Sequence, residues 1–163
     1  LSVIATASRP ESAAWCRALG AHHVLDHAGD LVAQAKALGL SVPYVFSTTQ
    51  TARHWPALCE ILAPQGMICA IDEAPGLDIS RLRAKSAGFH WEGMFARALF
   101  RTPDMARQHA ILNELADLLE AGALRSTLTR HLGPICAANL LAGHALVEEG
   151  RMIGKAVAEG WPD

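Results

Sequence analysis

The chain has 163 residues, of which 51% are apolar, and its formal net charge is −2 at neutral pH. This length suits one domain with a substantial buried core, and the composition excludes an intrinsically disordered protein. The charge gives no electrostatic footprint for nucleic acid or an anionic membrane, and no apolar run approaches the ~18 residues of a membrane span. No secretory signal is visible, and the four scattered cysteines lack zinc-site spacing, so we expect a cytoplasmic protein with reduced thiols and no metal site.

The beginning of the chain predicts a short buried strand that runs directly into a helix. The strand is the apolar run at residues 3–6, and the helix start is indicated by Ser8 and Glu11, which have the spacing of a capping box, and by Pro10. Gly20 would end this helix. In a dinucleotide-binding sheet such a unit follows a strand that carries the G-x-G-x-x-G turn, which is missing here, so the chain reads as a piece of a larger protein.

Short apolar strands and helices alternate along the following residues. Further strands are expected at His23–Leu25, Tyr44–Phe46, Met67–Ile71 and Gly88–Trp91. Helices are expected at Pro10–Leu19, Asp30–Leu38, Ala52–Leu62 and Ile79–Lys85. Apolar strands without polar alternation, separated by helices, are typical of a parallel sheet covered on both faces. The predicted fold class is therefore α/β, with a doubly wound, Rossmann-like parallel sheet.

The last third of the chain predicts the longest helix and a smaller strand–helix–strand unit. Thr102-Pro103-Asp104 would open the long helix, and Gly122 would follow its end. One face of this helix would carry Met105, Ile111, Leu112, Leu115, Leu118 and Leu119. A strand at Ser126–His131, a helix near Ala137–Glu149 and a short strand at Lys155–Ala158 complete the pattern.

Several motifs give the chain a family resemblance. The run from Val3 to Glu11, the Ala18-Leu-Gly-Ala21 turn and the late Met152-Ile-Gly-Lys-Ala-Val157 segment resemble the medium-chain dehydrogenase/reductase superfamily. Lys85-Ser86 and the stretch from Phe89 to Arg97 are similar to its zinc-type alcohol dehydrogenase-like branch, near the quinone oxidoreductases. The resemblance extends along essentially the whole chain.

The resemblance implies how the chain is organised and what the parent protein does. Residues 1–124 would form a partial dinucleotide-binding domain without its first strand and Gly-rich turn, and residues 125–163 the returning segment of the catalytic domain. Active members bind NADP(H) and reduce carbonyls, quinones or activated alkenes, so we expect NADP(H), a small-molecule substrate in the parent enzyme, and a homodimer. Many members of this branch lack zinc, and any zinc ligands would lie mostly outside this chain.

An alternative reading treats the chain by itself as a non-catalytic module. A missing central strand would leave unpaired backbone groups in the sheet, which cost free energy unless another segment forms hydrogen bonds with them. Dimerisation or rearrangement of strands could fill them, and such a truncated module would be stabilised mainly by its partner.

Ser8 and Arg9 are the first candidate cofactor contacts, because they follow the second strand of the usual Rossmann order. An NAD site needs a carboxylate here, whereas the 2′-phosphate of NADP needs positive charge and hydroxyl donors, which Ser8 and Arg9 supply. His27, just past the next strand, matches a position where the family resemblance implies a side chain against the same phosphate, and a histidine could donate there. The alternatives stay open that Ser8 only caps the helix and that Arg9 and His27 are ordinary surface residues.

A second group of candidates follows two later strands. Ser47 and Thr48, with Thr49, end the strand at 44–46, at the carboxyl edge where open α/β sheets bind ligands. Ile71 and Asp72 occupy the same edge of the next strand, where the family resemblance implies backbone groups directed toward the nicotinamide ribose. The alternatives are that Asp72 begins a turn and that a threonine simply caps the following helix, either Thr49 or Thr51.

No catalytic residue is identified from the sequence. His90 and Trp91 lie on the last strand of the sheet, where we expect them to be packing residues. Lys155 could approach the cofactor phosphates, but a charged end to a short strand is the simpler reading. The proton donor of the parent enzyme, if it has one, is expected outside this chain.

Overall fold

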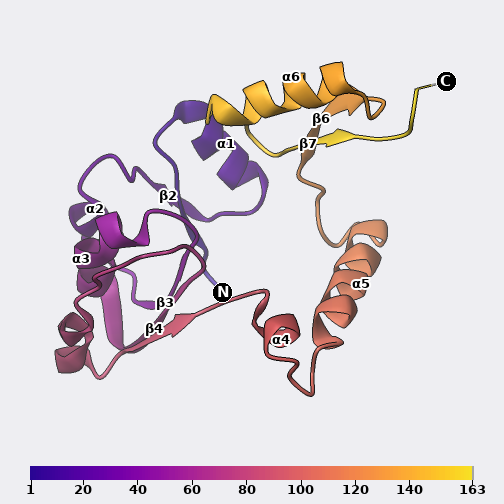
Figure 1. Cartoon of the computed structure of the whole chain (residues 1–163). Coiled ribbons are helices and arrows are strands. Elements are labelled where there is room, and N and C mark those ends of the chain that lie inside the picture. Colours follow the sequence, from indigo (N-terminus) through magenta and orange to yellow (C-terminus); the bar gives the residue numbers. More distant parts are fainter. Residues whose placement is uncertain (163) are drawn as a thin grey trace. The chain divides into compact units, whose positions relative to one another are not determined.

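The computed structural model describes residues 1–162, which form two compact units (Figure 1). The first unit contains Leu1–Ala13 and Ala21–Met105, and the second contains Ala14–Gly20 and Ala106–Asp163. The helix α1 (Pro10–Ala18) contributes to both. The predicted boundary between residues 124 and 125 concerns domains of a longer protein and stays a prediction.

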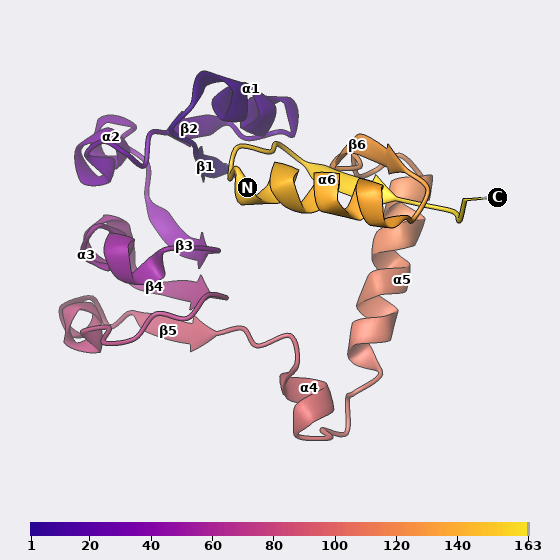
Figure 2. The same ribbon diagram turned by 45° about the horizontal axis from the view of Figure 1, so that its top comes forward.

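The strands of the first unit form two parallel sheets. β1 (Ile4–Thr6) pairs with β2 (His23–Leu25), and β3 (Val42–Ser47), β4 (Leu62–Ala70) and β5 (Gly88–Trp91) pair in that order. Every pairing is parallel, which confirms the α/β class and the predicted neighbourhood of the first two strands. The single sheet that the sequence indicated is divided into two, between β1 and β3 (Figure 2).

The predicted helices of the first unit are present in the predicted order, with shifted ends. They are α1, α2 (Leu31–Ala37), α3 (Thr51–Ile61) and the 3-10 helix η1 (Ile79–Lys85). A short helix α4 (Ala96–Leu99) was not predicted. α2 begins where expected, because the Asp30 carboxylate accepts from the Ala33 N–H at 3.0 Å.

The start of α1 corrects the predicted capping box. The helix begins at Pro10, so the capping position falls on Arg9 rather than on Ser8. The Ser12 hydroxyl donates to the Arg9 carbonyl at 3.1 Å, one turn into the helix. Because the chain turns one residue later than the Ser8–Glu11 spacing requires, that spacing does not coincide with the helix terminus.

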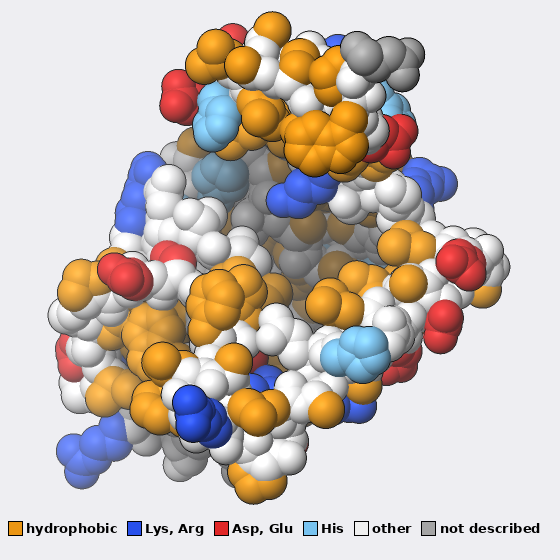
Figure 3. Space-filling view, turned by 45° about the vertical axis from the view of Figure 1, so that its right-hand side comes forward, with side chains coloured by type: hydrophobic (Ala, Val, Ile, Leu, Met, Phe, Trp, Pro, Cys, Tyr) orange, Lys and Arg blue, Asp and Glu red, His pale blue; other side chains and the backbone are white. Residues whose placement is uncertain are grey.

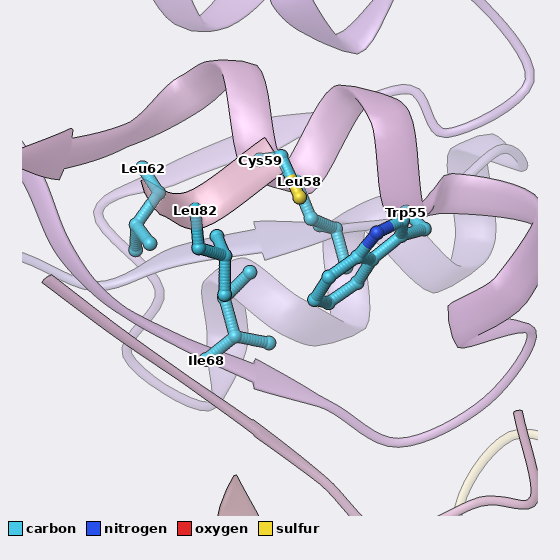
Figure 4. Packing of buried hydrophobic residues seen from close by; sticks show 6 residues of the cluster. All are labelled: Trp55, Leu58, Cys59, Leu62, Ile68 and Leu82. Atoms are coloured by element: carbon cyan, nitrogen blue, oxygen red, sulfur yellow. The ribbon is translucent and has the colours of Figure 1, made fainter. Parts of the chain in front are cut away.

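The core of the first unit lies between one face of the β3–β4–β5 sheet and the helices α3 and η1 (Figure 4). Its buried members are Trp55, Leu58, Cys59, Leu62, Ile68 and Leu82. The Trp55 ring also meets Phe89 edge-on at 5.4 Å, and its indole N–H donates to the Asp78 carbonyl at 3.0 Å. Burial raises the pKa of the Cys59 thiol, and all four cysteines are free.

The opposite face of the same sheet is open. The register pairs Tyr44 with Met67 and Phe46 with Cys69, so these side chains share one face, opposite to Val45 and Ile68. Tyr44 is 75% exposed and Phe46 is 65% exposed. The sheet is therefore covered on one face only, whereas the sequence predicted cover on both.

Lys85, part of a motif that carries the family resemblance, closes the end of α3. Its ammonium donates to the carbonyls of Cys59, Glu60 and Leu62 at 2.9, 2.7 and 2.7 Å. These carbonyls are at or next to the last turn of α3, where a cation is favoured by the unpaired C=O groups and the helix dipole. The role of Lys85 in this fold is therefore structural: it satisfies carbonyl groups at the C-terminal end of α3.

The second unit contains α5 (Arg107–Glu120), β6 (Leu128–Gly133), α6 (Ala137–Glu148) and β7 (Lys155–Ala158), with β6 and β7 parallel. The predicted long helix begins at Arg107, three residues after Asp104. Asp104 instead accepts from the Thr102 hydroxyl and from the Arg97 guanidinium, which holds this stretch in turns before α5. Across residues 1–162 no helix has the length and apolar character needed to cross a membrane.

Candidate functional site

A cavity of about 730 Å³ in the first unit is lined by β1, by β3 and the residues that follow it, and by side chains of α2 and α3. Its lining includes Thr6, His27, Ser47 and Thr48, which end or follow the strands β1, β2 and β3. The His27 ring, which follows β2, lies 6.2 Å from the ring of His54 in the first turn of α3, which follows β3. The carboxyl ends of the strands in the two sheets therefore meet at one edge, where parallel sheets bind ligands.

Ser47 and Asp72 are joined by a partly buried hydrogen-bond network through Thr51. The Ser47 and Thr51 hydroxyl oxygens are 2.6 Å apart, and the Thr51 N–H donates to the Asp72 carboxylate at 2.9 Å. The Thr51 hydroxyl donates to the other carboxylate oxygen of Asp72. Thr51 is completely buried. The hydrogen bond from the Thr51 hydroxyl, followed by that from its N–H, holds the pKa of Asp72 below its ordinary value.

The network shows what caps α3. Gln50, the residue before the helix, has a left-handed backbone and makes no side-chain cap, so the Asp72 carboxylate takes that role from the end of the next strand. The expectation that Thr49 or Thr51 caps the helix with its own side chain is therefore corrected. Sequence reasoning missed this contact because 21 residues separate Thr51 from Asp72.

Ile71 and Thr48 lie at the same edge with exposed side chains. The Ile71 N–H donates to the Ser47 carbonyl at 3.1 Å, which fixes the end of β4 against the end of β3. The structure thus brings Ser47, Thr48, Ile71 and Asp72 together, as the sequence indicated. Whether they contact a cofactor stays a prediction.

Ser8 and Arg9 lie between β1 and α1, just beyond the end of the cavity lining, which reaches Thr6. Ser8 is exposed and Arg9 is half-buried. Their proposed contact with a phosphate is likewise untested.

Basic side chains gather at this edge in a way the sequence did not indicate. Arg53 and His54, from the first turn of α3, line the cavity with His27. Burial, and then the nearby Arg53 and His27, lower the pKa of His54. The Arg53 guanidinium donates to the Gln50 side-chain carbonyl at 3.0 Å. The Arg53 guanidinium, beside two imidazoles that can donate hydrogen bonds, is an environment that suits an anion.

The remaining sequence candidates have local explanations. The Trp91 ring meets Phe89 edge-on at 4.7 Å, as a packing residue would. Lys155 is exposed at the start of β7, where its backbone N–H donates to the Thr127 carbonyl at 2.7 Å, as expected of a charged end to a short strand.

A zinc site does not fit the side chains present. Among residues 1–162, no three His, Cys, Asp or Glu side chains are placed to hold one metal ion. Zinc in proteins needs three or four such ligands. We therefore assign no step of any reaction to a metal held by these residues.

Comparison with known sequences identifies relatives along nearly the whole chain. The sequence profile of the family described as zinc-binding dehydrogenase matches residues 19–157. A zinc-type alcohol dehydrogenase-like protein of Staphylococcus aureus (strain COL) is 40% identical over 158 residues, which are 96% of this chain and 47% of that protein. A protein of the same description from Staphylococcus epidermidis is 33% identical, over 96% of this chain and 47% of its own length. The chain thus spans about half the length of these relatives.

Solved structures agree with the sequence relatives. A crystal structure described as a zinc-dependent alcohol dehydrogenase protein from Rhizobium etli is 49% identical with a TM-score of 0.92, over 100% of this chain and 48% of that one. A structure described as an NAD-dependent alcohol dehydrogenase is 22% identical with a TM-score of 0.73, over 97% of this chain and 43% of that one. The latter likeness shows a shared fold.

Proposed function

The chain belongs to the zinc-binding dehydrogenase family, and on that premise we propose that it forms the cofactor-binding half of an NADP(H)-dependent oxidoreductase. The observation that carries the proposal is the cavity edge where Ser47, Thr48 and the basic side chains of His27 and Arg53 meet. Hydroxyls suit a ribose, and a guanidinium beside an imidazole that can donate a hydrogen bond suits a phosphate. A relative by fold is described as NAD-dependent, which supports a nicotinamide cofactor.

In this proposal the chain binds and orients the cofactor. The Ser8 hydroxyl and the Arg9 guanidinium hold the 2′-phosphate that distinguishes NADP from NAD, with help from His27. Ser47 and Thr48 contact a ribose, and Ile71 lies toward the nicotinamide end. When bound, the nicotinamide exchanges a hydride with a carbonyl, a quinone or an activated alkene.

Asp72 contributes by positioning rather than by contact. Its carboxylate already accepts two hydrogen bonds from Thr51, so it fixes the first turn of α3 and, through Thr51, the Ser47 hydroxyl. A carboxylate held in this way keeps the polar residues at the end of β3 in one arrangement before any ligand arrives. None of these residues is assigned as the proton donor.

We further propose that the intact protein is a homodimer. β5 is an edge strand of its sheet, and Trp91 on it is 48% exposed. An exposed edge with an aromatic side chain is suited to pair with a second copy. The same contact would stabilise the chain if it acts as a non-catalytic module.

Cofactor preference tests the proposal on the chain itself. NADP⁺ and NAD⁺ are titrated into the wild type and the variants Arg9→Ala and Arg17→Ala while amide chemical shifts are followed by NMR. We expect weak binding, about millimolar, because a Gly-rich turn that would cradle the pyrophosphate is not part of this sequence. NADP⁺ should bind about tenfold more tightly than NAD⁺, because a charge-assisted contact is worth about 1.5–3 kcal/mol.

Arg17 lies at the other end of the same helix and is the matched control. Arg9→Ala should abolish the preference, whereas Arg17→Ala should preserve it. Equal affinity of the wild type for the two cofactors would refute the NADP(H) assignment. Shifts confined to residues away from Ser47, Thr48 and His27 would refute the site.

A further inference from the structure

The cavity of the first unit carries side-chain charge of one sign. Among the described residues that line it, the side chains that titrate or carry charge are His27, Tyr44, Arg53 and His54, and this set contains no Asp or Glu. A cleft lined by charge of one sign raises the local concentration of ions of the opposite sign. The lining therefore favours a ligand with negative charge.

Three of these side chains form a cluster. The rings of His27 and His54 meet edge-on with their centroids 6.2 Å apart. Arg53 lies beside them, since it acts electrostatically on His54 together with His27. Arg53 is exposed and the two histidines are half-buried, so a ligand in solvent can reach all three. The cluster combines a permanent cation with two imidazoles, the side chain whose charge ordinarily changes between pH 5 and 8.

The backbone under the cluster is fixed before any ligand binds. The Thr51 N–H and hydroxyl both donate to the Asp72 carboxylate, which fixes the first turn of α3. The Asp26 carboxylate accepts from the Ala28 N–H at 2.8 Å and fixes the turn that carries His27. Both carboxylates near the cluster therefore have hydrogen-bond donors of their own.

The Arg53 guanidinium is oriented as well. It donates to the Gln50 side-chain carbonyl at 3.0 Å. That contact takes one donor of a group that has five, in a planar fork that matches a phosphate. Arg53 is therefore placed to bind an anion and to keep its contact with Gln50.

The charged groups of the elements packed against α3 have other partners. α2 lies beside α3, and its Lys36 pairs with Glu60 at 3.0 Å (Figure 1). The Asp30 carboxylate caps α2. On η1, Arg81 pairs with Asp78 and Lys85 binds carbonyls at the opposite end of α3. The pKa of His54 is lowered by burial first, and then by Arg53 and His27, and none of these other groups is among its causes.

Mutual repulsion limits how many protons the cluster holds in the free chain. Two imidazolium rings at this spacing, beside a guanidinium, disfavour each other's charge. A phosphate monoester carries close to two negative charges at neutral pH, whereas a phosphodiester carries one. Arg53 and one imidazolium together match the charge of the monoester.

We propose that Arg53 and His54, together with His27, recognise the dianionic 2′-phosphate monoester of NADP(H), and that its binding takes up one proton from solvent onto the imidazole pair. This inference rests on the proposed function, which assigned that phosphate to Ser8, Arg9 and His27. The bound dianion stabilises the imidazolium that repulsion disfavours in the free chain, and each protonated ring nitrogen is a charge-assisted donor. Because binding consumes a proton, the affinity for the monoester rises as the pH falls.

Binding of adenosine 2′-monophosphate to the 163-residue chain tests the proposal. NMR follows the ring C–H signals of His27 and His54, which are assigned from His→Gln variants. The affinity should be about fivefold higher at pH 6.5 than at pH 8.5, a range above the phosphate's own second pKa of about 6. At pH 7.5 the ligand should move a ring signal of the pair toward its protonated position.

Adenosine 2′,3′-cyclic monophosphate is the matched ligand. It places a phosphodiester with a single charge on the same ribose oxygen. It should bind about tenfold more weakly than the monoester at pH 6.5, with little dependence on pH, because one charge does not favour a second cation in the cluster.

Substitutions of the histidines locate the proton. The double variant His27→Gln, His54→Gln should bind the monoester equally at the two pH values. His144→Gln, on α6 in the second unit, is the control and should keep the fivefold difference of the wild type. Amide spectra show whether each variant retains the fold.

Two substitutions of Arg53 separate its charge from its packing. Arg53→Gln should weaken binding of the monoester about tenfold, because a charge-assisted contact is lost, whereas Arg53→Lys should restore most of the affinity. In the free chain, Arg53→Gln should also raise the pKa of His54, because one of the causes that lower it is removed, and Arg53→Lys should not. A purely structural role of Arg53 would not distinguish the two variants in this way.

Four outcomes would overturn the inference. They are an affinity for the monoester that does not change with pH, equal affinity for the cyclic diester, a pH dependence that survives in the double histidine variant, and an Arg53→Gln variant that binds like the wild type. If NADP⁺ is still preferred to NAD⁺ through Arg9, any of these overturns this inference alone. Loss of that preference in the wild type, together with binding that does not depend on Arg53, would overturn both this inference and the proposed function.

Discussion

The two compact units of this chain differ in how much of their apolar surface is covered. In the first unit, six residues around Ile68 and Trp55 form a buried cluster. In the second, no described residue is buried, and the helix face predicted for α5 is exposed at Ile111 and Leu112. Apolar side chains are widespread on the surface seen in Figure 3. The first unit therefore carries a core of its own, whereas the second is suited to burial against other surfaces.

α6 shows the same contrast within a single element. Its sequence is apolar on every side, with Leu141 70% exposed and Val147 also exposed. A helix without a polar face is typical of a fully enclosed position. The relatives are about twice as long as this chain, so their additional residues are candidates to cover it.

The largest expected effect comes from matched isoleucine-to-alanine substitutions in the two units. Ile68→Ala should lower the free energy of unfolding by about 2–5 kcal/mol, because the side chain is completely buried and its loss leaves a cavity. Ile111→Ala should cost less than about 1 kcal/mol, because that side chain is already exposed to solvent. Urea unfolding monitored by circular dichroism compares the two. Equal losses would show that α5 is as well packed as β4.

A smaller effect is expected from two lysines near the end of α3. Lys85→Met should cost about 2 kcal/mol, because three carbonyls lose a charged donor. Lys36 is the matched control, since it pairs with Glu60 at 3.0 Å and both side chains are more than half exposed. Lys36→Met should therefore cost less than about 1 kcal/mol. A thermal unfolding series measures both. A similar loss of stability in the two variants would show that Lys85 does not stabilise the C-terminal end of α3.

The smallest effect concerns Asp72 and depends on pH. Because Thr51 lowers the pKa of Asp72 in the folded chain, the carboxylate stabilises the fold above its ordinary value of 3.8, and this contribution is lost as the pH falls through the lower folded value. Asp72→Asn should cost about 1 kcal/mol at pH 7, as the loss of a helix cap does.

The difference between wild type and Asp72→Asn should narrow as the pH is lowered from about 5 to about 2. Urea unfolding at several pH values measures it. Asp117→Asn, on α5 in the second unit, is the control and should change stability by less than about 0.5 kcal/mol. A difference that does not vary with pH would mean that the Asp72 carboxylate does not cap α3.

Most of the elements could be predicted from local pattern. His23–Leu25, Gly88–Trp91 and Lys155–Ala158 are strands with the predicted ends. The strands β3 and β4 are longer than their apolar runs because Val42 pairs with Leu62, on the far side of an irregularity. Pro43 and Pro64 interrupt the apolar pattern there, so a prediction based on periodicity begins both strands too late.

The candidate site was predicted in part. Placing Ser47, Thr48, Ile71 and Asp72 at one edge required only that parallel strands end on the same side. The network from Ser47 to Asp72 and the approach of His27 to His54 were not predictable, because each depends on which strands and helices lie side by side. Residue type and spacing do not encode such partners.

The sequence by itself determined the α/β class, the order of the elements and the family, because apolar periodicity, helix ends and motifs are local properties of the chain. Only the tertiary structure decided that the strands form two sheets with facing edges and that Asp72 and Lys85 fix the two ends of α3. Those features join residues more than 20 positions apart. The hydrogen bonds and the burial that stabilise these features form only when the strands pair in the folded chain.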